Sequence, residues 1–88
     1  MDFQHTSCLG GGTIGASWAA LFLAFGRSVC LYDTAPDAEA NVRRYIETAW
    51  PTLESLGLTD KGRPDAITFV HSAAEAVEGA DFIQENVP

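Results

Sequence analysis

Three glycines near the amino end of the chain have the spacing of a phosphate-binding loop. The segment consists of Gly10, Gly11, Gly12, Thr13, Ile14 and Gly15, which fits the pattern G-x-G-x-x-G. Gly10 allows a tight turn out of a strand, and Gly12 has no side chain to keep a pyrophosphate from the backbone. Gly15 lets a following helix lie close to that strand. We therefore expect the helix to begin at an anion-binding loop.

One carboxylate lies where a dinucleotide site needs it. A second apolar run, from Ser28 to Tyr32, ends at Asp33, about 20 residues beyond the glycines. A carboxylate at this place accepts hydrogen bonds from the hydroxyls of the adenosine ribose. It repels a 2′-phosphate, and positions 34–36 hold no arginine to offset that charge. The pattern therefore predicts NAD as cofactor rather than NADP, although a purely structural glycine turn stays open at this point.

The elements around the glycines are predicted to alternate between strand and helix. We expect a strand at Thr6–Leu9, a helix from Thr13 to Phe25 closed by Gly26, and a strand at Ser28–Tyr32. This second strand is apolar throughout, as is typical of a parallel strand covered on both faces. The helix carries one broad apolar face at helical spacing, made of Ile14, Trp18, Leu21, Phe22 and Phe25.

A second helix is predicted after Asp33. Residues 34–37 resemble a helix start, with Thr34 as the cap. Pro51 is expected to kink or break the helix after Trp50, because it lacks an N–H and clashes with the preceding turn. Gly57 is expected to close the second piece.

The remaining elements complete an α/β pattern. Residues 66–70 are predicted to form a third strand, Ser72 to Glu75 a capping box that opens a short helix, and residues 81–85 a fourth strand. Strands and helices in this alternation favour a Rossmann-type doubly wound parallel sheet, with strand order 3-2-1-4 and a ligand crevice where strands one and four diverge. We expect the sheet to be partial and the chain to be truncated after strand four.

Composition excludes several classes of protein. The chain has 88 residues, enough for one small domain over residues 1–88, and a net charge of −7, which disfavours nucleic acid as a partner. The start of the chain has no basic and apolar signal segment, and no apolar run is long enough to cross a membrane. Cys8 and Cys30 lack metal-ligand spacing, so we expect no metal site. Buried, reduced thiols in a cytoplasmic protein are the expected reading of this pair.

The motifs together resemble a known family. The glycine segment at 10–15, the strand ending in Tyr32-Asp33 and residues 79–88 are similar to the amino-terminal NAD domain of the L-3-hydroxyacyl-CoA dehydrogenase family. The resemblance covers nearly the whole chain. Within the family, residues 49–53, Gly57-Leu58 and residues 81–85 most resemble the carnitine 3-dehydrogenases. Asn86-Val87 differs from the small residues typical of this place.

The resemblance implies an enzyme that oxidises an L-3-hydroxyl to a ketone with hydride transfer to NAD. Its substrate would be a small 3-hydroxy acid such as carnitine or a 3-hydroxyacyl-CoA, with a place in fatty acid metabolism. In that family a histidine takes the hydroxyl proton and a glutamate orients it, both beyond residue 88, so we expect no catalytic residue in this chain. His5 and His71 are expected to be solvated or capping, and Glu85 to be structural or peripheral to the cofactor.

The resemblance also implies a longer parent enzyme with a second, mostly helical domain that forms homodimers. Two alternatives remain open. One is a gulonate dehydrogenase of the lambda-crystallin type, and the other is a module that binds NAD without turning it over. We expect the isolated 88 residues to be marginally stable or oligomeric, to bind NAD weakly and to oxidise no 3-hydroxy acid.

Overall fold

Four parallel strands form the centre of the molecule. The computed structural model describes residues 4–86. The strands are β1 (His5–Leu9), β2 (Ser28–Tyr32), β3 (Ile67–Phe69) and β4 (Phe82–Glu85), in the order β3-β2-β1-β4. Both the parallel pairing and the predicted order 3-2-1-4 are confirmed. Strand β1 begins at His5, one residue before the predicted start at Thr6.

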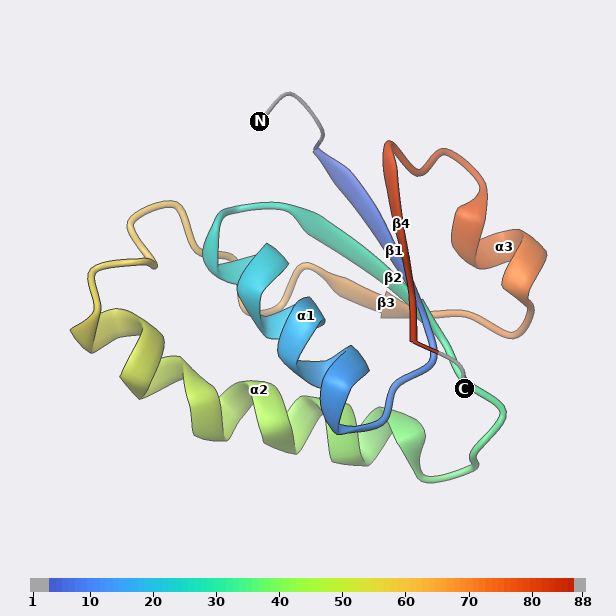
Figure 1. Cartoon of the computed structure of the whole chain (residues 1–88), viewed down its shortest axis with the longest axis horizontal. Coiled ribbons are helices and arrows are strands. Elements are labelled where there is room, and N and C mark those ends of the chain that lie inside the picture. The colour runs from blue at the N-terminus through green and yellow to red at the C-terminus, as the bar shows by residue number, and fades with distance from the viewer. Residues whose placement is uncertain (1–3, 87–88) are drawn as a thin grey trace.

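The helices divide between the two faces of the sheet. Helices α1 (Thr13–Ala24) and α2 (Ala38–Ser55) lie on one face, and the short α3 (Ala73–Val77) lies on the other (Figure 1). Right-handed crossovers require this division, because the chain steps one way from β1 to β3 and then returns past β1 to β4. The reversal places the carboxyl ends of β1 and β4 side by side, at the switch point where such sheets bind ligands.

The two faces of the sheet are covered unequally. On the side of α1 and α2, Val29 and Leu31 are fully buried against the helices. On the other side, Cys30 and Tyr32 are only half-buried, because the short α3 is the element that packs there. The expectation that β2 is covered on both faces therefore holds for one face and only in part for the other.

Helix α1 buries a face that shares only Phe22 with its predicted apolar stripe. Its buried positions are mainly small residues, namely Gly15, Ala16, Ala19, Ala20, Phe22, Leu23 and Ala24. Ile14 is 66% exposed and Trp18 is 36% exposed. Small residues occupy the inner face in the first half of the helix, which starts against β1, whereas the large Phe22 and Leu23 are buried nearer its end. Most of the large apolar side chains point outward or lie half-buried.

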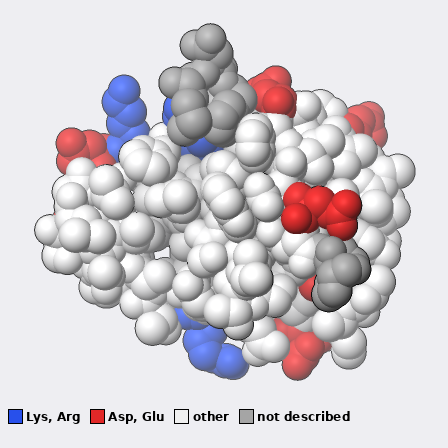
Figure 2. All heavy atoms as spheres, in the orientation of Figure 1, with Lys and Arg blue, Asp and Glu red and all other residues white. Residues whose placement is uncertain are grey.

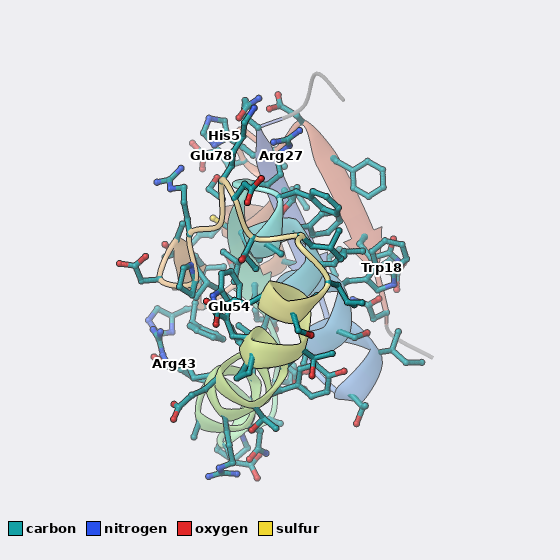
Figure 3. All side chains as sticks on the ribbon, turned by 90° about the vertical axis from the view of Figure 1, so that its left-hand side faces the viewer. His5, Trp18, Arg27, Arg43, Glu54 and Glu78 are labelled. Carbon is teal, nitrogen blue, oxygen red and sulfur yellow. The ribbon has the colours of Figure 1, made fainter. Side chains whose placement is uncertain are left out.

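A cluster of three aromatic rings lies where α1 meets β4. The rings of Trp18 and Phe22 are 5.7 Å apart, and those of Phe22 and Phe82 are also 5.7 Å apart, edge to face. The Trp18 ring projects outward from α1 (Figure 3). In Figure 2 the charged side chains surround the area over α1, which itself carries none.

Helix α2 differs from the predicted form at two places. It begins at Ala38 with Asp37 as the N-cap residue, so Thr34 does not cap it. It continues through Pro51 to Ser55, so of the predicted kink or break after Trp50 the break is wrong. Proline removes one helical hydrogen bond, and the turns on both sides remain anchored because Trp50 and Leu53 pack against the core.

The capping box predicted at Ser72 to Glu75 is confirmed, whereas the prediction of buried thiols holds for Cys8 and only in part for Cys30. Ser72 caps α3 by accepting a hydrogen bond from the Glu75 N–H at 3.1 Å. Cys8 and Cys30 are both free, with Cys8 fully buried and Cys30 half-buried. Among residues 4–86, we found no helix with the length and apolar character of a membrane span.

Gly15 is the position at which α1 approaches the end of β1 most closely. A Cβ there would lie 2.0 Å from the carbonyl oxygen of Gly10, whereas a Cβ at Gly12 would meet nothing within 4 Å. We therefore expect Gly15→Val to lower the free energy of unfolding by about 1–3 kcal/mol through overpacking. Gly12→Val is the matched control, and its free energy of unfolding falls by less than that of Gly15→Val. Urea unfolding without NAD measures both, and equal losses would contradict the packing argument.

Candidate functional site: a crevice at the carboxyl ends of the strands

A crevice of about 650 Å³ opens where β1, β2 and β4 end. The residues that line it are Gly10, Gly12, Thr13, Ile14, Gly15, Tyr32, Asp33, Thr34 and Asn86. Six of the seven predicted site residues therefore meet at one cavity. The seventh, Gly11, lines a neighbouring cavity of about 300 Å³ between the first turns of α1 and α2.

The glycine loop turns sharply from strand to helix. Gly10 has a φ of 103°, a region that side chains rarely tolerate, while its N–H still donates to Tyr32 O at 2.8 Å. Gly12 is the N-cap residue of α1, has no side chain that caps the helix, and is exposed to the crevice. The first turn of α1 holds no acidic residue. Its orphan N–H groups and the helix dipole therefore favour an anion at this place.

Gly11 has a steric role that the sequence pattern did not assign. It is buried, and a Cβ there would lie 3.0 Å from a methyl carbon of Leu31 and 3.1 Å from one of Val42. The loop is thus pressed against β2 and α2. The unbroken run of three glycines is the sequence signal for this packing.

Asp33 holds the glycine loop as well as facing the crevice. One carboxylate oxygen accepts a hydrogen bond from the Gly11 N–H at 2.6 Å, and the other accepts one from the Ala35 N–H at 2.8 Å. Each carboxylate oxygen has a second lone pair, so acceptor capacity remains for a ligand hydroxyl. Asp33 is half-buried, and its carboxylate is fixed in place before any ligand arrives.

Asn86 is one of three crevice residues that were not predicted as site residues, the others being Tyr32 and Thr34. Its backbone N–H continues the sheet by donating to Leu9 O at 2.8 Å. Its side-chain Nδ2 donates to Gly10 O at 3.2 Å. The available signal was a polar side chain directly after the fourth strand, at the edge where the strands end.

The two histidines lie away from the middle of this crevice. His5 lies with Arg27 and Glu78 at the end of the molecule opposite the glycine loop (Figures 1 and 3), and its ring Nδ1 is 2.7 Å from Ser28 Oγ. His71 is exposed and lines a small cavity beside Asp33 on the α2 side, not among the crevice residues. Neither is placed beside Gly12 or Asn86.

Two groups with displaced pKa values also lie outside the crevice. Burial raises the pKa of the Cys8 thiol to about 12, so this thiol is inert at neutral pH. The N–H groups of Gln4 and His5 donate to one oxygen of Asp81, each at 3.0 Å, and hold the pKa of that carboxyl below its usual range. Asp81 precedes β4 at the amino end of the sheet. Among residues 4–86, no cluster of His, Cys, Asp and Glu could hold a metal ion.

The geometry fits a dinucleotide. The space beside Gly12 is open where a Cβ would stand, the helix start favours a phosphate, and Asp33 lies one strand away with acceptor capacity. The helix start and the carboxylate line the same crevice, as a site for pyrophosphate and adenosine ribose requires.

Comparison with known proteins agrees with this geometry. L-carnitine dehydrogenase of Streptomyces coelicolor is 45% identical over 87 residues, which are 99% of this chain and 27% of that protein. The enzyme of the same name from Streptomyces griseus is 46% identical over 87 residues, 99% of this chain and 26% of that protein. The chain therefore spans about a quarter of the length of these relatives.

A solved structure shows the same fold at detectable sequence similarity. It is that of 5-formyl-3-hydroxy-2-methylpyridine 4-carboxylic acid 5-dehydrogenase, described as an NAD⁺-dependent dismutase. Its TM-score is 0.79 at 34% identity, and the match covers 97% of this chain and 28% of that one. Residues 5–88 match the family described as 3-hydroxyacyl-CoA dehydrogenase, NAD binding domain. On this evidence the chain belongs to the NAD-binding domain family of the 3-hydroxyacyl-CoA dehydrogenases.

Proposed function

We propose that this chain binds NAD for a dehydrogenase that oxidises the 3-hydroxyl of a small 3-hydroxy acid of the carnitine type. Bound NAD accepts the hydride. Within the chain, the amides at Gly12, Thr13 and Ile14 receive the pyrophosphate at the start of α1. Asp33 accepts hydrogen bonds from the adenosine ribose, and Gly10, Gly11 and Gly15 shape the loop.

One observation carries this proposal, namely that a hydrogen bond joins the glycine loop to Asp33. The 2.6 Å hydrogen bond from the Gly11 N–H to Asp33 fixes the distance between the phosphate-binding and ribose-binding groups. The open position at Gly12 leaves room for phosphate against the backbone. A purely structural turn would need neither that open space nor a carboxylate with acceptor capacity facing the crevice.

The substrate and the setting of the enzyme are further parts of the proposal. Identities of about 45% to L-carnitine dehydrogenases support a free 3-hydroxy acid as substrate over an acyl-CoA. The reaction would convert the hydroxyl to a ketone, with catalytic groups supplied from outside this chain. Two free cysteines suit a reducing compartment such as the cytoplasm, and the family resemblance supports a homodimer.

The substrate class can be tested directly on the full-length protein. Absorbance of NADH is followed with NAD and either L-carnitine or a 3-hydroxyacyl-CoA. We expect turnover with L-carnitine that exceeds turnover with the acyl-CoA at equal concentration. The reverse order would contradict the carnitine-type assignment while leaving NAD binding intact.

Asp33 should set the preference for NAD over NADP. We expect Asp33→Ala to lower the ratio of the Kd for NADP to the Kd for NAD at least tenfold, because the like charge beside the 2′-phosphate is removed. The Kd for NAD rises, since the Gly11 and Ala35 N–H groups lose their acceptor, while removal of the like charge offsets this loss for NADP. Calorimetric titration measures the ratio. Asp60→Ala, the same charge change in an exposed loop, is the control, and an unchanged ratio in Asp33→Ala would refute the role.

Gly12 should be required for binding rather than for folding. A valine side chain at this position fills the open space beside the backbone, where the pyrophosphate is to lie. We expect Gly12→Val to keep its fold and to show no rise in melting temperature with NAD at a concentration that stabilises the wild type. A variant that NAD still stabilises as it does the wild type would show that the pyrophosphate lies elsewhere.

A further inference from the structure

The peptide group between Gly10 and Gly11 is held from two sides. Its carbonyl oxygen, on Gly10, accepts the hydrogen bond from Asn86 Nδ2 at 3.2 Å. Its N–H, on Gly11, donates to Asp33 at 2.6 Å. The two side chains come from the ends of different strands, Asp33 from after β2 and Asn86 from after β4. A single peptide group at the turn is therefore bound between two strand ends.

Asn86 extends the sheet by one hydrogen bond beyond the last residue of β4. Its backbone N–H binds Leu9 O at 2.8 Å, and its side chain binds the next carbonyl, that of Gly10. The backbone alone cannot reach this second carbonyl, because Gly10 turns out of the strand with a φ of 103°. The Asn86 side chain is itself oriented by Gln84, whose Nε2 donates to Asn86 Oδ1 at 3.3 Å.

The same contact lies beside Gly15, where α1 packs against the end of β1. Gly10 O lies 2.0 Å, and Asn86 Nδ2 lies 3.2 Å, from where a Cβ would stand on Gly15. The carbonyl that Asn86 holds is thus the one against which α1 packs. Rotation of this peptide would move the Gly11 N–H away from Asp33 and change the direction of the amides that follow.

We propose that Asn86 is a positioning residue of the cofactor site, which holds the Gly10–Gly11 peptide so that the loop presents its amides to the pyrophosphate. Asn86 acts through the loop and needs no contact with the reacting atoms. Its loss therefore lowers the affinity for ligands that carry the pyrophosphate more than for ligands that lack it. This inference rests on the proposed cofactor site at the glycine loop and Asp33.

The test compares two ligands in the full-length protein. NAD carries the pyrophosphate, and adenosine carries the ribose without any phosphate. We expect Asn86→Ala to raise the Kd of NAD about tenfold and to leave the Kd of adenosine, measured by NMR titration, within twofold. Asn86→Asp keeps the shape and places an acceptor against Gly10 O, so we expect a larger loss of NAD affinity than in Asn86→Ala. Gln4→Ala, which removes an exposed side-chain amide at the opposite end of the sheet, is the control and changes the Kd of NAD less than threefold.

Three results would overturn the inference. They are unchanged NAD affinity in both Asn86 variants, equal losses for NAD and adenosine, and failure of both variants to fold. The last would make Asn86 a requirement of the fold and not of the site. Gly12→Val, measured in parallel, separates this inference from the proposed function. If it loses NAD while both Asn86 variants bind normally, only the role of Asn86 fails, whereas normal NAD binding by Gly12→Val refutes the site itself.

Discussion

The contact between α1 and the end of β1 is the constraint on which the rest of the structure depends. With no side chain at Gly15, the helix can start directly against the Gly10 carbonyl. This close start aims the first turn of α1 at the crevice, and it requires small residues at Ala16, Ala19 and Ala20. The same geometric requirement therefore produces both the anion-binding helix start and the tightly packed inner face of the helix.

The hydrogen bonds that hold the site join residues that follow the ends of three strands. Gly10, Asp33 and Asn86 each follow a different strand, and parallel pairing brings those three ends to one edge of the sheet. Hydrogen bonds between them then link the loop to its neighbours on both sides. A carboxylate and an amide hold one peptide group, so the loop is ordered before the cofactor binds. Such preorganisation lowers the entropic cost of binding.

The outer surface of α1 has a different character from the crevice. Ile14, Trp18 and Phe82 are exposed, and the ring of the buried Phe22 lies 5.7 Å from the rings of Trp18 and Phe82. Large apolar side chains in this arrangement are typical of a surface that packs against further protein. The inner face of α1 consists mainly of small residues that pack against the sheet, whereas most of the large apolar residues of the helix are exposed or half-buried.

The sequence by itself determined the order of the elements, the strand order, the glycine turn and the place of Asp33. These follow from local rules, namely glycine spacing, apolar runs, a capping box and the handedness of crossovers, and the structure confirms the elements and their order. Tertiary structure decided which face α1 buries, since periodicity records where apolar residues stand but not how close the neighbouring strand lies. It also decided that α2 continues through Pro51, because packing by Trp50 and Leu53 outweighs one missing hydrogen bond. The link from Asn86 to Gly10 spans 76 positions in the chain, and a contact at that separation exists only after the sheet has brought the two strand ends together.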